Sequence, residues 1–440
     1  MKIFNIAFIL FFVLSCTPDR YNVVERNISK ADIKIIELRA ASDRMIVDGK
    51  SAMEFNTILY GIKKIKKRYK EQVNELISYN TTTKLDTFII PRDQYSKDLV
   101  KIYYNVDKIV SNNIFYSKGI TADKLDFFAK VGDLVSKKIT IKMRKGVVND
   151  YKDIVIPVIF HVMNPPSYTS PPMKLDFKTV KAKLDLLNLV FNRKRTSNPN
   201  AGTANITFKL AKYDNDGVLL EQEGLDINNY KKTKTSAEIL DLMKKTALWD
   251  PSKYLNIWIG EINDSFSWSS DGSGSYMVEK PNVILTGKSV IKGIEAKEVS
   301  QYKVTDDTKL TDVGIVYNRE EFLITESRGM SYTLSKIIGL YFGLNEMKYN
   351  SHWDWKKQSN VDNLVEGDTD FCEDTPVYED AFSIYKKMLD SDTYFTTFNI
   401  MANYSQKNSI TVNQVDRIRE VIDKCPSRWA YKSDWAFTGK

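Results

Sequence analysis

Residues 333–347 read TLSKIIGLYFGLNEM and form the most informative stretch of this chain. Apolar side chains recur here with helical spacing. The glycine at position 343 permits a sharp change of direction, because it has no Cβ. The stretch therefore predicts an amphipathic helix that packs in a core and ends at Gly343. From these residues alone, an ordinary core helix with a glycine stop is a sufficient interpretation.

The spacing of the glycines also fits a more specific frame. The Ile-Gly-x-x-x-Gly-Leu pattern of residues 338–344 resembles the active-site helix of metzincin metallopeptidases. In that family, H-E-x-x-H-x-x-G-x-x-H supplies three zinc ligands and a general base. Other residues occupy all four functional positions here: Lys336, Leu340 and Glu346 replace the histidines, and Ile337 replaces the glutamate.

This set of side chains does not fit a zinc site. A lysine ammonium and a leucine have no lone pair for the metal, and the usual site needs deprotonated ligands such as neutral imidazole. The whole chain contains two histidines, His161 and His352, which cannot supply three ligands. The resemblance therefore implies a peptidase fold with no remaining catalytic residue and no expected cofactor. We expect Lys336 and Glu346 to pair in place of the metal.

Six further segments resemble pappalysin-type metzincins, specifically the zinc-dependent metalloproteinase lipoproteins of Bacteroidota, and they occur in the order of that family. They are residues 154–163, 187–191 (L-N-x-x-F), 254–258 (Y-L-N-I-W), 370–376 (D-x-C-x-D-T-P), 399–404 (a Met-turn) and 411–419 (T-x-x-Q-x-x-R-x-R). The resemblance implies an α+β, metzincin-like (zincin) domain over residues 151–440. In it, Met401 would be core filling beneath the former site, and His161 a packed or hydrogen-bonded strand residue.

Periodicity predicts the other elements of this region. Apolar residues with helical spacing indicate a helix at 177–191, and residues 237–248 also predict a helix. Strand patterns occur at 154–163, 206–211 and 282–285. The family resemblance implies a further strand at 254–259 and a closing helix at 411–419.

The N-terminal half predicts an all-β domain over residues 32–146. Strand patterns occur at 35–40, 45–47, 52–55, 100–104 and 138–143, with a turn at 48–51. The turn and the spacing of residues 129–141 resemble bacterial immunoglobulin-like sandwiches. A cationic stretch, residues 62–70, interrupts this pattern. We interpret it as a solvated loop or insertion; the alternative is a basic helix that binds acidic lipid headgroups.

The N-terminus carries a targeting signal. Residues 1–15 read as a signal peptide, with an apolar run about half as long as a bilayer-spanning helix needs. The run ends in Val13-Leu14-Ser15-Cys16, which resembles a bacterial lipobox with Cys16 as the lipidated residue. Residues 16–31 then form a tether. The resemblance implies a lipid-anchored protein of the cell envelope, at the outer membrane or cell surface; the alternative is an ordinary secretory signal.

The other two cysteines are Cys372 and Cys425. In an envelope compartment a disulfide between them can persist, and two buried free thiols are the alternative. The net charge of +8 arises from 64 basic and 56 acidic residues that are interspersed along the chain. No basic run with interleaved aromatic residues indicates nucleic-acid binding.

Three functions are consistent with these observations. The first is a pseudo-peptidase of the cell envelope that binds a peptide or protein. The second is an active zinc endopeptidase with a relocated site, for which the candidate ligands are His352, Asp354, Glu346 and Asp374. The third is a structural adhesin. One histidine with carboxylates binds zinc less well than three imidazoles, so the first hypothesis is favoured.

Overall fold

The computed structural model describes residues 28–440 with internal gaps. The gaps are residues 74–75, 147–149, 167–174, 195, 197, 233, 263–275, 324–332, 348–350, 355–358, 363–369, 377, 380–384, 389–393 and 403–407. The expected signal peptide, the lipobox with Cys16 and most of the expected tether lie outside the described residues. None of the described helices is long and apolar enough to cross a membrane.

The chain divides into two compact units. The first contains Met1–Glu37, Ile58–Lys101 and Ala129–Ser136, and the second contains Leu38–Thr57, Ile102–Phe128 and Lys137–Lys440. Strands β3 (Ala52–Val73) and β8 (Lys124–Val131) run through both units. The domain boundary expected between residues 146 and 151 stays a prediction.

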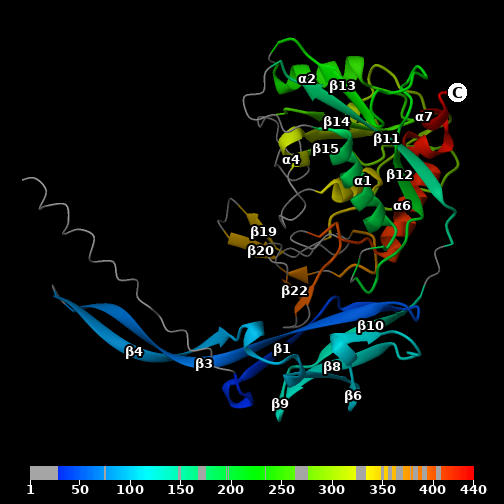
Figure 1. Ribbon diagram of the computed structural model, residues 1–440. Helices are drawn as coiled ribbons and strands as arrows, with labels where there is room; N and C mark the ends of the chain where they lie inside the picture. Colours follow the sequence, from blue (N-terminus) through cyan, green and yellow to red (C-terminus); the bar gives the residue numbers. More distant parts are fainter. Residues whose placement is uncertain are drawn as a thin grey trace, which may run out of the picture. The chain divides into compact units, whose positions relative to one another are not determined.

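A long antiparallel ribbon dominates the first unit. Strand β3 pairs with the whole of β4 (Leu76–Ile89), from Tyr60↔Ile89 to Val73↔Leu76, and Figure 1 shows the two strands side by side there. The interpretation of residues 62–70 as a loop, and its helical alternative, are both wrong. Two isoleucines of β3, Ile62 and Ile65, and the three consecutive threonines of β4 that pair with positions 66–68 are β-branched residues that favour extended backbone.

Two sheets of the second unit contain the N-terminal strands. One has the order β2 (Arg44–Val47), β10 (Ile139–Lys145), β8, β5 (Lys101–Tyr104) and β6 (Lys108–Ile109). The other has β21 (Tyr378–Glu379), β22 (Tyr385–Met388), β23 (Tyr394–Thr396), β1 (Ile35–Ala40) and the start of β3, where β7 (Ile114–Tyr116) also pairs. The strands expected in this half are thus present; an immunoglobulin-like topology stays a prediction.

The third sheet organises the rest of the second unit, which is mixed α/β. Its order is β12 (Ile206–Leu210), β11 (Ile154–Asn164), β14 (Leu255–Gly260), β18 (Gly314–Asn318) and β15 (Tyr276–Met277), and β13 (Leu225–Asn229) also pairs with β11. All of its pairs are parallel except β15 with β18. Strand residues alternate between two cores, because successive side chains point to opposite faces.

Helices cover both faces of this sheet (Figure 1). Helix α1 (Phe177–Phe191) and helix α5 (Leu334–Tyr341) pack with Phe160 and Ile257 in the larger core. Helix α2 (Ser236–Thr246) packs with Trp258 and Val316 in the smaller one. The remaining strands and α-helices of the described residues are β9 (Leu134–Val135), which pairs with β8, β16 (Val283–Leu285), β17 (Lys297–Val299), α3 (Leu310–Val313), α4 (Arg319–Leu323), β19 (Ser351–Asp354), β20 (Ser359–Asp362), α6 (Val412–Lys424) and α7 (Trp435–Thr438).

His161 lies in the middle of β11 and is fully buried. Its Nδ1 is 2.7 Å from Asp226 Oδ2, and its Nε2 is 2.9 Å from Asn256 Oδ1. The prediction of a hydrogen-bonded strand residue is therefore confirmed. A buried imidazole with partners at both nitrogens avoids the cost of unsatisfied polar atoms.

Two asparagines, Asn188 of α1 and Asn192 at the end of this helix, form hydrogen bonds with the backbone of β12 at the outer edge of the sheet. Asn188 Nδ2 donates to the Phe208 carbonyl at 2.9 Å, and the Phe208 N–H donates to Asn188 Oδ1 at 2.8 Å. Asn192, one turn later, makes the same pair of bonds with Ile206, at 2.7 and 3.3 Å. The side-chain amides thus replace a neighbouring strand and leave this part of the edge without free backbone groups.

Candidate functional site

Helix α5 is built as its sequence predicts. Thr333 caps its N-terminus and accepts a hydrogen bond from the Lys336 N–H at 3.2 Å, and every residue of the helix is buried. The chain leaves the helix through Gly343, whose φ of 80° is left-handed. The Leu344 N–H then donates to the Gly339 carbonyl at 2.9 Å. The glycine stop is confirmed, since a side chain is disfavoured at this φ.

Met401 lies directly beneath the helix. A Cβ added at Gly339 would lie 2.9 Å from Met401 Sδ, so the helix approaches the sulfur as closely as a glycine allows. The Met347 N–H also donates to the Met401 carbonyl at 3.0 Å, which links the segment after the helix to the same residue. Met401 is fully buried in the larger core. Its prediction as core filling is confirmed.

Lys336 and Glu346 form an ion pair in this segment. Lys336 Nζ is 2.6 Å from Glu346 Oε1, so the expected close approach is confirmed. The lysine side chain is only 1% exposed, whereas the glutamate side chain is 34% exposed. Ile337 and Leu340 are also buried. The four positions that the sequence resemblance compares with metal ligands and a base therefore hold an ammonium, two aliphatic side chains and a carboxylate.

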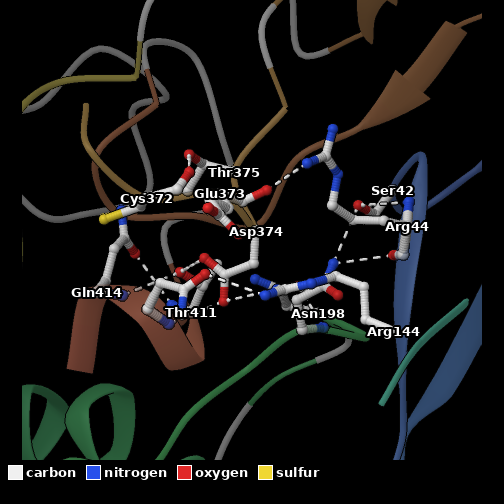
Figure 2. Close-up of polar contacts among 12 residues, drawn as sticks. Ser42, Arg44, Arg144, Asn198, Cys372, Glu373, Asp374, Thr375, Thr411 and Gln414 are labelled. Carbon is white, nitrogen blue, oxygen red and sulfur yellow. Dashed lines mark hydrogen bonds and ion pairs between the residues drawn. The ribbon is translucent and has the colours of Figure 1, made fainter. Parts of the chain in front are cut away.

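Asp374 is a second buried charged group, and Figure 2 shows the contacts around it. The Thr411 hydroxyl donates to Asp374 Oδ1 at 2.6 Å, and the Asn413 N–H donates to Oδ2 at 2.8 Å. Arg144 Nη1 lies 3.3 Å from Oδ2. Burial raises the pKa of Asp374, and these three partners oppose the increase. The carboxylate accepts hydrogen bonds from the first residues of α6, so both of its oxygens already have partners within the protein.

Strands from the N-terminal half supply two arginines to this region. Arg44 of β2 donates to the Glu373 carbonyl, and Arg144 of β10 donates to Asn413 Oδ1 at 3.1 Å (Figure 2). Asn200 Nδ2 in turn donates to the Arg44 carbonyl at 2.9 Å. Sequence reasoning missed both arginines. Each stands alone in a strand pattern with no motif around it, so no signal in the sequence marked them.

The candidate ligands of the alternative zinc site do not form a described cluster. His352 and Asp354 lie in β19, whose side chains are outside the described part of the structure, and Asp374 is engaged as above. Among the described residues, no group of three His, Cys, Asp or Glu side chains is arranged to hold a metal ion.

Cys372 and Cys425 are both free, buried thiols in this structure. Burial raises the pKa of each, for Cys425 to about 11. A thiol with a raised pKa is a poor nucleophile, because the thiolate is the reactive form. These two residues are therefore packing residues rather than reactive ones.

Comparisons with known proteins give structural neighbours only. The structure of Tannerella forsythia mature mirolysin in complex with a cleaved peptide aligns with 65% of this chain and 97% of its own chain, at 20% sequence identity and a TM-score of 0.42. A Tannerella forsythia promirolysin mutant aligns with 65% of this chain and 86% of its own, at 19% identity and a TM-score of 0.42. The structure of mirolysin in complex with compound 9 aligns with 65% of this chain and 98% of its own chain, at 18% identity and a TM-score of 0.42. No family model and no curated protein matches the chain.

Asp370 provides a pH-dependent contribution to stability. Burial raises its pKa from 3.8 to about 6. Thr375 Oγ1 lies 2.6 Å from Asp370 Oδ2 and 2.7 Å from the Cys372 carbonyl oxygen. One hydroxyl proton cannot serve both oxygens. A protonated Asp370 can instead donate to Thr375, whose hydroxyl then donates to Cys372.

This geometry gives a pH prediction. The folded-state pKa of Asp370 is above its ordinary value, so the folded state binds the proton more tightly. The free energy of unfolding should therefore fall as the pH rises from about 4 to about 6, by about 2–3 kcal/mol, and stay lower above that range. Urea unfolding of the native protein and of Asp370→Asn at several pH values checks this. A pH dependence that is the same in both proteins would contradict it.

Proposed function

We propose that this chain is a metzincin-like peptidase that has lost its zinc centre and binds a peptide or protein segment without cleaving it. One observation carries the proposal: a buried Lys336 ammonium, paired with Glu346, at the first and third ligand positions. A fixed positive charge repels a zinc ion, and no helix-borne carboxylate remains to deprotonate a water molecule. The residues present therefore do not fit a catalytic zinc.

The packing around α5 supports the relation to this family. The left-handed Gly343 redirects the chain so that Glu346 returns to Lys336, and Met401 lies under Gly339. A parallel sheet with one antiparallel edge strand, β15, stands beside this helix. The glycine turn and the buried methionine are features that the family resemblance of the sequence implies.

A peptide ligand is supported by the other edge of the sheet. Among the described strands, β15 is the terminal strand at that edge, and extended peptides commonly add to such an edge through backbone hydrogen bonds. A cavity of about 480 Å³ is lined by residues 279–282, which follow β15 in the sequence, and by residues of later segments. Its lining is mostly charged or polar: Glu279, Lys280, Pro281, Asn282, Gly293, Glu295, Lys309 and Asp312. Such a cavity suits a polar or charged side chain of the peptide.

The loss of zinc is tested by restoring the motif. The native protein should bind much less than one zinc ion per chain and should not cleave a peptide library with zinc added. A variant with Lys336→His, Ile337→Glu, Leu340→His and Glu346→His should bind about one zinc ion per chain, because three imidazoles then converge. Elemental analysis and cleavage of fluorogenic peptides provide the two readouts.

A matched variant separates metal binding from catalysis. The same three histidine substitutions with Ile337 retained should bind zinc but cleave nothing, because the general base is missing. Stoichiometric zinc in the native protein, with cleavage that a chelator abolishes, would refute the proposal and favour the relocated site. A structural adhesin would share the lack of zinc but would bind no peptide from the library.

We also propose that the chain is lipid-anchored at Cys16 in the cell envelope, facing the outside of the cell or the periplasm. The support is the lipobox-like sequence that ends the apolar run. The mass of the mature N-terminal peptide would reveal the lipid.

A further inference from the structure

Strand β12 has one unpaired position at its outer edge. Alternate residues of a strand direct their backbone N–H and C=O groups to the same side. The Ala211 N–H donates to the Val158 carbonyl of β11, whereas Phe208 directs both of its backbone groups outward to Asn188. Leu210 therefore also directs its N–H and C=O outward. Within the described part of the chain, no group forms a hydrogen bond with either of them.

The position of Leu184 in α1 explains why the side-chain amides end before Leu210. Asn192 bonds near the start of β12 and Asn188 bonds two residues later, so the helix and the strand run in opposite directions. Four helical residues advance by about 6 Å, and two strand residues advance by about 6.6 Å. Leu184, one turn before Asn188, is therefore the residue opposite Leu210. Its side chain has no polar atom, so the third pair of hydrogen bonds is missing.

The gap is one residue long. Beyond it, the next outward residue is Lys212, whose N–H donates to the Ala436 carbonyl at 2.7 Å and whose carbonyl accepts from the Leu220 N–H at 2.8 Å. On the other side, Asn188 already occupies the edge. An extended peptide therefore cannot pair continuously along β12. A ligand can reach the Leu210 backbone only with a single group.

A cavity of about 620 Å³ lies at this gap. Its lining contains Leu184, Leu210, Asn188 and Phe437 of α7. Lys209, whose side chain lies on the other face of β12, also lines it, so the cavity lies at the edge of the sheet. Cavities of this size hold ligands larger than a single amide group. The group that pairs with Leu210 would thus be part of a longer molecule.

We propose that this cavity binds the carboxamide of an asparagine or glutamine side chain carried by a peptide. Its amide nitrogen would donate to the Leu210 carbonyl and its oxygen would accept from the Leu210 N–H, as Asn188 does with Phe208. An ionised carboxylate only accepts and a lysine only donates, whereas a carboxamide has a donor and an acceptor on the same carbon. Strand β12 is at the opposite edge of the sheet from β15, so this site does not depend on the proposed function.

Amide hydrogen exchange tests whether the gap exists. In the free protein, the Leu210 N–H should exchange about tenfold faster than the Phe208 N–H, because only the Phe208 N–H has a hydrogen-bond partner. Residue-resolved mass spectrometry measures both rates in one experiment. Exchange at Leu210 as slow as at Phe208 would overturn the proposal, since the Leu210 N–H would then already have a partner.

Peptide binding tests the chemistry of the ligand. Three peptides carry glutamine, methionine or glutamate between two alanines, with acetyl and N-methylamide ends so that no other primary carboxamide is present. The glutamine peptide should bind about tenfold more tightly than the other two, because each of them lacks one or both hydrogen bonds. It should also slow exchange at Leu210 and leave Phe208 unchanged. Equal affinities, or slower exchange at β15 with none at Leu210, would overturn the proposal; the second result would still agree with the peptide site proposed at β15.

Substitution of Leu184 tests the geometry from within the protein. Leu184→Asn supplies the third amide, so exchange at Leu210 should slow about tenfold and binding of the glutamine peptide should be lost. Leu184→Met is the matched control, since it has a similar volume and no amide, and it should bind the peptide as the native protein does. Thermal unfolding verifies that both variants are folded, because Leu184 is buried. Equal effects of the two substitutions would overturn the proposal, and the measurements on the native protein decide it if Leu184→Asn does not fold.

Discussion

Glu346→Ala should lower the free energy of unfolding by about 2–4 kcal/mol. The substitution leaves the Lys336 ammonium buried without the carboxylate that lies 2.6 Å away. An unpaired buried charge costs several kcal/mol, whereas the intact pair roughly balances its own desolvation. The expected loss stops at about 4 kcal/mol because the Glu346 side chain is one-third exposed and its pairing with Lys336 is partly screened by solvent. Equilibrium urea unfolding measures the change.

Two comparisons isolate the buried charge as the cause. Lys336→Met should cost less than Glu346→Ala, because it retains the aliphatic stem and leaves behind a glutamate side chain that is 34% exposed, whereas Glu346→Ala leaves a lysine that is 1% exposed. Adding Lys336→Met to Glu346→Ala should therefore recover stability. Asp241→Ala breaks the exposed Lys245–Asp241 pair of α2 and should change stability by less than about 0.5 kcal/mol. A Glu346→Ala variant as stable as Asp241→Ala would refute this account of the pair.

Asp374→Ala should destabilise the protein by about 3–5 kcal/mol. Three groups lose their acceptor at once: the Thr411 hydroxyl, the Asn413 N–H and the Arg144 guanidinium. The first two belong to the start of α6, where a lost cap alone costs about 1 kcal/mol. The remainder comes from donors left unsatisfied in a buried site. Urea unfolding provides the measurement.

Asp374→Asn is the matched substitution. It keeps the volume and one oxygen acceptor, so it should cost about half as much as the alanine variant. Asp185→Ala removes an exposed carboxylate that pairs with Lys181 of α1 and should be nearly neutral. If Asp374→Ala were as mild as Asp185→Ala, the carboxylate would not hold α6, and Asp374 would again be a candidate for another role.

Strands β11 and β12 of the third sheet and the helix α1 could be predicted from the sequence because their patterns are local, whereas the short strands β13 and β15 were not expected. Helix α1 has the expected bounds, since Asp176 caps it and its apolar residues recur with helical spacing. Strand β14 (Leu255–Gly260) begins and ends one residue later than the sequence predicts. The Lys336–Glu346 pair was also predictable, because a left-handed glycine at position 343 fixes where the chain returns.

The β3–β4 ribbon and the contacts of Asp374 were not predictable in the same way. The ribbon was missed because a run of lysines lowers the strand signal, and the partner that stabilises it, β4, is recognised only through pairing. The arginines at 44 and 144 meet Glu373 and Asp374 across hundreds of residues. No short segment of the sequence indicates these contacts, because they depend on how strands from distant parts of the chain pair.

The same long-range contacts affect the order in which this protein can fold. Arg44 and Glu373 are 329 residues apart, and Ala40 of β1 pairs with Phe395 of β23. At a synthesis rate of about 5–20 residues per second, the ribosome needs about 15–65 s to provide these partners. Contacts of such high sequence separation also slow folding after synthesis, because the chain loses the conformational entropy of closing a large loop before the contacts contribute any stability. The edge of β1 that pairs with β23 must therefore wait for the last third of the chain, and it is exposed to aggregation in the meantime.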